Sequence, residues 1–598
     1  MTPSVASARE RWARGLGALC GLLALACAAP HALSAGPNAG ARECPAAQAS
    51  AAPRATTAAK PRAFHPGQAG LALRLVPKPE APALCVQVSA YGDNAQLRSW
   101  RLLQAAPTEL LSVRQLFEGG HSRALSVAAD GGGVQLLIPT DDQRESSGVL
   151  TIDYCVRAAA FNAAEPLTTA VDPNHFRATG ERALLLPDVY RSAPVPTRVT
   201  LQAAGLGAPP GAASSLGVGL TRELDISVSG LQHAAFIAGP LGSARFNGPE
   251  GSDEAAWVGY TAFDPRPVAA QVATFRSAVR DYFGDPASTP LTLLLLSDGR
   301  SAGDFDVARR TASVLVQVGM SQPWDGPLSL AVSHQVVREW LGSKLRLSAQ
   351  GSAVWFNEGF SRFLARELSF RMGQIEPTEY AQEVEALTSV SVTSPLAALS
   401  AAQLAPKLAA GEPAALTLEV ARGALWASQL HADLARKGQS LHKILRDLYG
   451  APAPATAQQL MTAVDAALGC EATACSAQHS FDKWILSGAS PSLSGDALGV
   501  CFKAVPRSYP IYQRGFSVTG GRVSELTAKG PAGRAGLKLG DKLLSLRDRP
   551  GNASAPLTIR VERGGAPLEF SFLPQSGSVS STGWVQLRHI APARCPRP

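Results

Sequence analysis

The first part of the chain alternates between apolar and polar residues in short segments. Residues 71–76, 83–88, 133–138 and 148–154 follow this pattern and are bounded by Gly, Pro and Asp. Such alternation is typical of β-strands that bury one face against a core. We therefore predict an N-terminal β-sandwich domain over residues 67–192.

After residue 192, β character continues to about residue 245, for example at 199–202 and 224–228, and helical spacing begins further along the chain. Residues 268–283 carry apolar side chains three and four positions apart, whereas the run 291–296 is almost entirely apolar and of strand length. A run of this kind is typical of a buried strand. We predict a mixed domain over residues 193–376, followed by an Ala- and Leu-rich helical subdomain over 377–495. The whole chain is then a multidomain α+β protein.

Two helices are expected near the middle of the chain, at residues 328–345 and 358–372. Asn357 directly precedes the second and is a natural N-cap, because its side-chain oxygen can accept a backbone hydrogen bond in the first turn. The apolar side chains of this second helix repeat on one face and predict core packing: Phe360, Phe363, Leu364 and Leu368.

The N-terminus has the pattern of a secretory signal. An apolar segment at 15–29 follows three arginines within the first 14 residues and is too short to span a membrane comfortably. We predict a signal peptide over residues 1–35 and a disordered Ala/Pro-rich linker over 36–66. The expected location is secreted or periplasmic, with no transmembrane span after cleavage; a lipoprotein anchored at Cys27 is a minor alternative.

The distribution of charge along the chain argues against one class of partner, the nucleic acids. The formal net charge is +8, and the Lys and Arg residues are scattered without interleaved aromatic residues. A nucleic-acid-binding surface requires clustered positive charge, so we expect no nucleic-acid partner.

Seven cysteines follow the predicted cleavage site, and an oxidising compartment favours disulfides. Cys85 and Cys155 lie in the predicted β domain and are candidates for one bridge. Two further bridges are possible among four C-terminal cysteines, with the connectivity open: Cys470, Cys475, Cys501 and Cys595. The count is odd, which makes Cys44 in the linker the expected spare.

The candidate chemistry lies in two short motifs. Residues 333–342 read S-H-Q-V-V-R-E-W-L-G, and residues 355–360 read W-F-N-E-G-F. In H-E-x-x-H, two histidines one helical turn apart bind zinc and the glutamate acts as general base. The two motifs resemble those of gluzincin metallopeptidases, namely the aminopeptidase N and glycyl aminopeptidase families. This resemblance implies a thermolysin-like catalytic-type domain with a metal site at His334, position 338 and Glu358.

Two substitutions alter the chemistry that the resemblance implies. Gln335 stands at the position of the general base and cannot take a proton from water. Arg338 stands at the position of the second histidine and is always cationic. At about 4 Å, a guanidinium opposes a divalent ion by roughly 8 kcal/mol at an effective dielectric constant of about 20. We therefore expect Arg338 to form a partly buried ion pair with Glu358, with no metal and no cofactor bound.

A third position agrees with this interpretation. In the family, a tyrosine stabilises the oxyanion of the tetrahedral intermediate, and the matching position here is Val420. Glu339 is an alternative metal ligand, but it lies five residues after His334 and so points away from the same helix face. We expect no catalytic residues in this chain.

The C-terminal region, residues 496–598, resembles a PDZ domain. The run 530–541 reads G-P-A-G-R-A-G-L-K-L-G-D, and apolar residues expected in its small core are Ala535, Leu537 and Leu543. The segment before it resembles a carboxylate-binding loop and edge strand with these peptide-binding residues: Arg514, Gly515, Phe516, Ser517 and Val518. PDZ domains bind peptides by strand addition at such an edge.

The sequence thus favours a secreted or periplasmic relative of glycyl aminopeptidases that has lost zinc and catalysis. It would bind peptides or protein C-termini through its cleft and PDZ domain. The alternative is an active zinc-dependent aminopeptidase of the glycyl aminopeptidase type with atypical ligands.

Overall fold

The computed structural model describes residues 63–139, 148–159, 168–248, 251–259, 261–286, 289–300, 302–303, 305–347, 352–451, 454–470, 476–548, 551–554, 556–587 and 595. The predicted signal peptide and most of the predicted linker lie outside these residues, as do Cys27, Cys44 and Cys475. Within the described part, no helix is long and apolar enough to cross a membrane.

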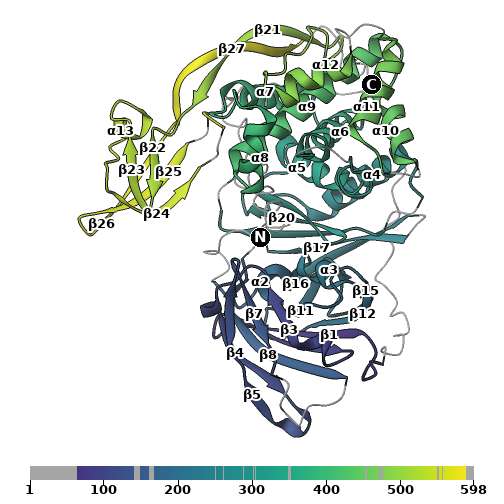
Figure 1. Ribbon diagram of the computed structural model, residues 1–598, viewed down its shortest axis with the longest axis vertical. Helices are drawn as coiled ribbons and strands as arrows, with labels where there is room; N and C mark the ends of the chain where they lie inside the picture. The colour runs from purple at the N-terminus through teal and green to yellow at the C-terminus, as the bar shows by residue number, and fades with distance from the viewer. Residues whose placement is uncertain are drawn as a thin grey trace, which may run out of the picture.

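The N-terminal part consists of two β-sheets around one core (Figure 1). The larger sheet has the order β15-β12-β1-β2-β8-β4-β5 and the smaller β11-β3-β7-β6. Their bounds are β1 Gly70–Lys78, β2 Ala83–Tyr91, β3 Ser99–Leu102, β4 Leu110–Leu116, β5 Ser122–Ala124, β6 Val127–Asp130, β7 Gly133–Leu137, β8 Val149–Arg157, β11 Leu186–Pro187, β12 Val195–Leu201 and β15 Thr221–Ile226. Because β12 pairs with β1, two strands that follow residue 192 lie in the N-terminal sheet.

Alternation in these strands has the expected effect, since every second residue of β1, β2 and β8 is buried. Cys85 and Cys155 are directly opposite each other on β2 and β8 and form a disulfide, as predicted. Short helical turns complete this part: η1 Gln96–Arg98, η2 Pro107–Glu109, η3 Glu118–Gly120, α2 Gly180–Ala183 and α3 Val228–Gln232.

A second, larger sheet crosses the middle of the molecule (Figure 1). Its main order is β14-β13-β16-β17-β18-β20-β19, and β9 and β10 join it beside β16. The bounds are β9 Ala170–Val171, β10 Phe176–Thr179, β13 Pro210–Ser214, β14 Gly217–Val218, β16 Ala235–Gly248, β17 Gly251–Val258, β18 Thr292–Asp298, β19 Asp306–Arg310 and β20 Ser313–Gly319. β18 is buried along its whole length, which confirms the predicted buried strand.

Helices cover the upper side of this sheet in Figure 1 and share one continuous apolar core with it. α4 confirms the helix predicted from residue 268 to 283 and begins slightly earlier, after an Asp264 cap. The helices are α4 Pro265–Phe283, α5 Gly326–Val337, η4 Trp355–Phe360, α6 Ser361–Arg371, α7 Pro377–Thr393, α8 Ala401–Ala409, α9 Pro413–Arg436, α10 Leu441–Tyr449, α11 Ala457–Leu468, α12 Ala477–Phe481 and η6 Asp482–Leu486. The predicted helical character beyond residue 377 is therefore present.

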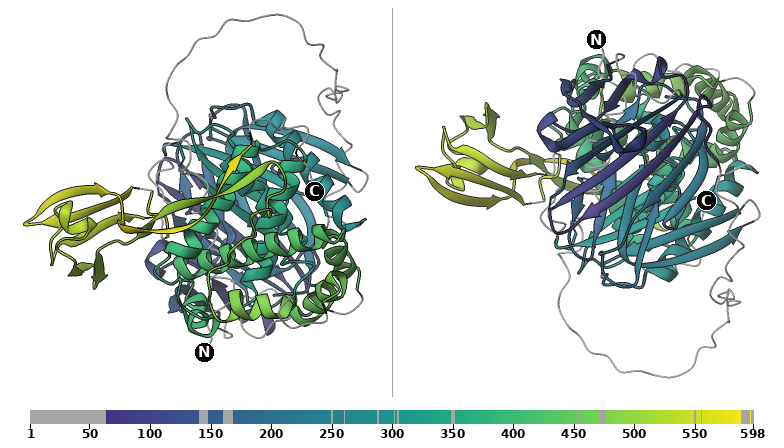
Figure 2. Two further views of the ribbon diagram at one scale, coloured as in Figure 1. Left: turned by 90° about the horizontal axis from the view of Figure 1, so that it is seen from above. Right: turned by 90° about the horizontal axis from the view of Figure 1, so that it is seen from below.

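A two-stranded ribbon connects this body to a small C-terminal module, which projects to one side (Figures 1 and 2). The ribbon pairs β21 (Phe502–Tyr512) with β27 (Gln575–Gln586) and lies against α7. At its root, Cys501 and Cys595 form a disulfide, one of the pairings that the sequence left open.

The module itself is a five-stranded antiparallel sheet with one short helix beside it. Its elements are β22 Phe516–Thr519, β23 Arg522–Leu526, α13 Pro531–Arg534, β24 Lys542–Arg547, β25 Leu557–Arg563 and β26 Ala566–Phe572. Leu537 is fully buried in its core and Leu543 partly buried, as expected. Ala532 occupies the core instead of the predicted Ala535, because Ala532 lies on the inner face of α13.

Candidate functional site

The first motif lies on α5, a helix that begins with a side-chain cap. The Asp325 side chain accepts a hydrogen bond from the Leu328 backbone N–H at 3.0 Å. The helix ends at Val337, so the prediction that it continues to residue 345 was wrong. The chain instead turns at Gly342, which has a φ of +87° and packs against Asn357. Such a φ favours glycine, and it explains why the helix stops before this point.

The second motif forms a π-helical turn, η4, rather than the start of a capped helix. Val354 already has helical backbone, so Asn357 lies inside the turn and is not an N-cap as predicted. π-Helical turns are rare and are frequent at functional sites. Here the turn carries Glu358 toward α5.

Two glycines hold η4 against α9 at very short range. A Cβ on Gly423 would lie 1.9 Å from the Trp355 carbonyl oxygen, and one on Gly359 would lie 2.8 Å from the Gly423 Cα. Neither position can carry a side chain without moving the backbone. Backbone contact between η4 and α9 therefore fixes the position of Glu358 in the interior.

The two motifs bring His334, Arg338 and Glu358 together. Arg338 Nη2 lies 2.6 Å from Glu358 Oε1, so the expected ion pair is present. His334 Nε2 lies 3.5 Å from Glu358 Oε2 and 3.2 Å from the Glu358 backbone oxygen. His334 and Glu358 are buried, and the Arg338 side chain is 15% exposed. The guanidinium thus occupies the place where the resemblance implies a metal-binding imidazole.

Gln335 completes this cluster through contacts with Arg338 and His334. Its Oε1 accepts a hydrogen bond from Arg338 Nη1 at 3.2 Å, and its Nε2 lies 3.5 Å from His334 Nδ1. The side chain is 2% exposed. An amide in this position orients its two neighbours but has no basic lone pair for proton abstraction.

Glu339 faces a different part of the protein, as expected from its helix position. Its carboxylate receives both Nε and Nη2 of Arg276 from α4, at 3.1 and 3.0 Å. Lys344 approaches it at 3.7 Å. Because this bidentate pairing occupies the Glu339 carboxylate, Glu339 is not a metal ligand beside His334.

Val420 is fully buried on α9 and lines a small cavity of about 10 Å³ with Arg362 and Glu383. These two residues form a buried ion pair, with 3.0 Å between Arg362 Nη2 and Glu383 Oε2. Val420 offers only methyl groups, so it cannot donate a hydrogen bond to a developing oxyanion.

The surroundings keep His334 neutral. Burial lowers the pKa of His334 well below its usual range, and the nearby guanidinium groups of Arg362 and Arg338 lower it further. The backbone oxygen of Glu358 acts in the opposite direction but does not compensate. A neutral imidazole can bind a metal ion, but the positive charges of the neighbouring guanidinium groups oppose the binding of a cation here.

This depressed pKa predicts a pH dependence of stability. Below about pH 6.5 the histidine of the unfolded chain takes up a proton that the folded protein excludes, so stability is present above this pH and is lost as pH falls. The His334 contribution is at most about 1.4 kcal/mol per pH unit. Urea unfolding across this range should show a steeper pH slope for the unaltered protein than for His334→Gln. Equal slopes would contradict the depressed pKa.

The described residues offer too few donors for zinc at this place. No three His, Cys, Asp or Glu side chains are grouped to hold a metal ion in the part of the chain that the structure describes. Only His334 and Glu358 supply donor atoms, and the third neighbour is a cation. Zinc sites in enzymes use three protein ligands and a water, so this donor set does not fit zinc.

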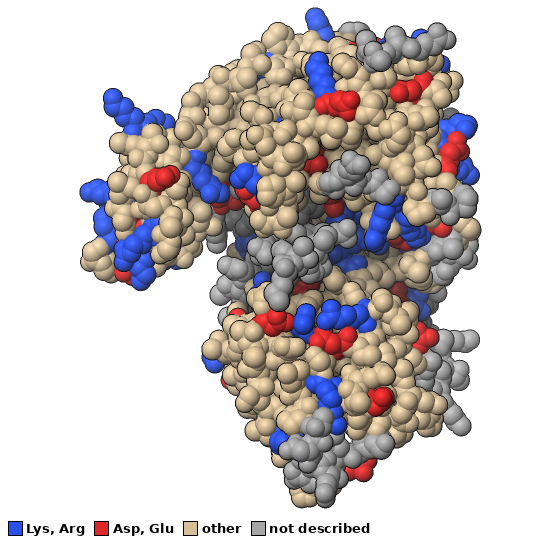
Figure 3. Space-filling view, viewed as in Figure 1, with Lys and Arg blue, Asp and Glu red and all other residues tan. Residues whose placement is uncertain are grey.

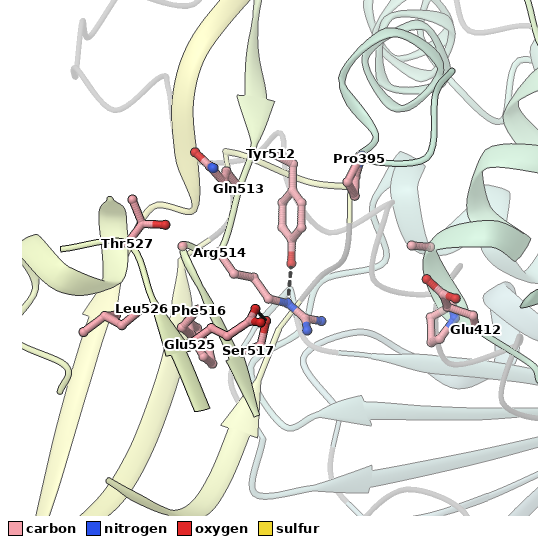
Figure 4. A pocket seen from close by; sticks show the side chains of 13 residues that line it. Pro395, Glu412, Tyr512, Gln513, Arg514, Phe516, Ser517, Glu525, Leu526 and Thr527 are labelled. Carbon is pink, nitrogen blue, oxygen red and sulfur yellow. Dashed lines mark hydrogen bonds between the residues drawn. The ribbon is translucent and has the colours of Figure 1, made fainter. Parts of the chain in front are cut away.

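The predicted peptide-binding residues lie elsewhere, at a pocket of about 560 Å³ between the module and the helical part (Figure 4). Arg514, Gly515, Phe516 and Ser517 line it, whereas Val518 does not. The other wall comes from residues that sequence reasoning missed: Pro395, Glu412, Pro413 and Ala414. Only the three-dimensional arrangement brings the first turn of α9 to this place.

Within this pocket, Arg514 already has an internal partner. Its guanidinium pairs with Asp548, and its Nε lies 3.0 Å from the Tyr512 hydroxyl oxygen. The same hydroxyl donates a hydrogen bond to Asp548 at 2.6 Å. Arg514 therefore braces the loop before β22, and its charge is largely neutralised within the module.

Comparison with known proteins bears on the architecture. No known family profile and no curated protein matches the sequence. The aminopeptidase N family protein from Idiomarina loihiensis matches with a TM-score of 0.62 and 14% identity, over 86% of this chain and 98% of that one. This chain has the fold of that protein.

An M1 zinc metallopeptidase from Deinococcus radiodurans is also similar, with a TM-score of 0.44 and 18% identity over 72% of this chain and 96% of that one. The match to the aminopeptidase N family protein confirms a multidomain α+β architecture. Fold does not imply function, and the chemistry of a site depends on the side chains that form it.

Proposed function

We propose that this protein is a secreted or periplasmic relative of glycyl aminopeptidases that has lost zinc and catalysis and binds peptides or protein C-termini. The observation that carries the proposal is the ion pair between Arg338 and Glu358 at 2.6 Å. It places a permanent cation beside the two remaining donor groups. Repulsion between a guanidinium and a divalent ion at this range is comparable to a useful zinc affinity.

Location in an oxidising compartment is supported by two disulfides. Cys85–Cys155 joins two strands of the N-terminal sheet, and Cys501–Cys595 closes the root of the ribbon. Disulfides persist in secreted and periplasmic proteins and are rare in the cytosol.

Peptide binding is supported by the module. Its sheet presents β22 as an edge strand, and the PDZ-like loop at Arg514–Phe516 stands at the start of that strand. A peptide that adds to a sheet edge gains main-chain hydrogen bonds and side-chain pockets. On the face shown in Figure 3, basic and acidic side chains are interspersed, without the continuous basic surface that nucleic acids require.

Metal content and peptidase activity test the loss of catalysis together. We expect the purified protein to contain well below one equivalent of zinc and to release no amino acid from short peptides with N-terminal Gly or Ala, with or without added zinc. Glu358→Gln serves as a matched control and should leave any background hydrolysis unchanged. Stoichiometric zinc with chelator-sensitive turnover that Glu358→Gln abolishes would establish the alternative, an active aminopeptidase with atypical ligands.

A further inference from the structure

The outer edge of β22 is available for a further strand within the described residues, because β22 is the first strand of its sheet and pairs with β23 on the other side. The Thr527 backbone N–H donates to the Gly515 oxygen at 2.8 Å, so these two residues form a hydrogen-bonded pair. Pairs alternate along an antiparallel ladder. The N–H and C=O groups of Phe516 therefore point toward the outer edge, and the pairing of β22 with β23 is regular from there to Ser517, where a β-bulge follows.

The position of the predicted carboxylate-binding loop fixes the direction of an added peptide. The loop precedes β22, so a C-terminal carboxylate placed there makes the peptide antiparallel to β22. Its last residue then lies opposite Phe516 and its next-to-last residue opposite Ser517. Directly opposed side chains share one face of a sheet. The next-to-last side chain is thus on the face of Ser517, away from the module core that contains Phe516.

Two carboxylates line the pocket beside this strand, Glu525 on the side of the module and Glu412 on the side of α9 (Figure 4). The Ser517 hydroxyl donates to Glu525 Oε2 at 2.8 Å, which holds the Glu525 carboxylate over Ser517. Glu412 lines the opposite wall of the same pocket, at the start of α9. Glu412 also pairs with Lys407 at 3.0 Å, but both side chains are more than a third exposed, so this pair is weak.

The remaining charged residue of the pocket does not offset these carboxylates. Arg514 is the cation that lines it; its side chain is 39% exposed, but its guanidinium pairs with Asp548, whose side chain is only 6% exposed. The pocket measures about 560 Å³, which is ample for a long side chain beside a peptide backbone. An anionic pocket next to a strand edge selects for a basic side chain.

We propose that the module binds protein C-termini whose next-to-last residue is Arg or Lys, with the basic side chain held between Glu525 of the module and Glu412 of α9. The inference rests on the proposed peptide binding and adds its specificity. It also makes the site a joint one, because one wall belongs to the module and the other to the helical part.

Fluorescence polarisation on the full chain tests this inference, using labelled peptides with free C-termini that differ only in the next-to-last residue (Arg, Lys, Ser or Glu). We expect Arg and Lys peptides to bind about tenfold more tightly than Glu peptides, since attraction replaces repulsion, with the difference shrinking at high salt. Glu525→Lys should reverse the order, and Glu412→Lys should reduce the preference.

Glu569→Lys is the matched control, because Glu569 is an exposed residue of β26 at the far edge of the same sheet. It should leave the preference unchanged. Binding of all peptides with equal affinity, or an unchanged order in Glu525→Lys, would overturn the specificity while peptide binding itself stands. Failure of every free C-terminus to bind would overturn both.

Discussion

A zinc site is expected to appear when Gln335→Glu is combined with Arg338→His. The change removes the guanidinium now 2.6 Å from Glu358 and places an imidazole one helical turn after His334. Three protein ligands are then available, which is the number that catalytic zinc sites use. Calorimetric titration should show about one zinc per chain, and zinc at about 1,000 times its Kd should stabilise the fold by about 4 kcal/mol.

Gln335→Glu alone is the control, since it restores the general base but keeps the cation. We expect it to bind no zinc. Turnover by the double variant should remain low, because an absent oxyanion donor reduces kcat by about 10²–10³ and Val420 supplies none. Tight zinc binding by the control, or by the unaltered protein, would show that the repulsion is not decisive.

Arg338→Met is expected to destabilise the protein by about 3–5 kcal/mol. The substitution leaves the Glu358 carboxylate buried without its cation, and an uncompensated buried charge is strongly unfavourable. The double variant Arg338→Met with Glu358→Leu should recover most of the loss, because a buried ion pair contributes little beyond an apolar replacement of similar size. Urea unfolding of the three proteins measures both effects.

A surface pair of the same length provides the matched comparison. Lys443 and Asp447 on α10 also lie 2.6 Å apart, but their side chains are 75% and 61% exposed. Lys443→Met should change the free energy of unfolding by no more than about 0.5 kcal/mol. If Arg338→Met has an equally small effect, the ion pair does not hold the two motifs together.

The sequence predicted which side chains meet at the site, but not the backbone that brings them together. The resemblance of the two motifs to gluzincin metallopeptidases was what paired Arg338 with Glu358. The predicted length of α5 was wrong. The helical spacing of apolar residues continues past Val337, whereas the chain must turn at Gly342 to pack against Asn357. A tertiary contact therefore overrode a local pattern.

The π-helical turn illustrates the same limit. Asn357 is a good N-cap by local chemistry, yet helical backbone is already present at Val354. Close contact between η4 and α9 at Gly359 and Gly423 accompanies this geometry, and the two glycines are far apart in the sequence. Likewise, the sequence indicated the loop at Arg514 but not its partner Asp548 or the wall formed by α9.

The ribbon that carries the module makes the module a removable insert. Tyr512 and Gln575 are paired neighbours although the whole module lies between them. The strand that returns is needed by the body, because the Trp584 N–H donates to Glu385 of α7 at 2.8 Å and Cys595 bridges to Cys501. Truncation of the chain before the module would therefore also remove β27, the strand that packs against α7. Joining residue 512 to residue 575 through a tight turn would instead remove the module and leave the ribbon and the body intact. The same junction is a position at which another binding domain can be inserted.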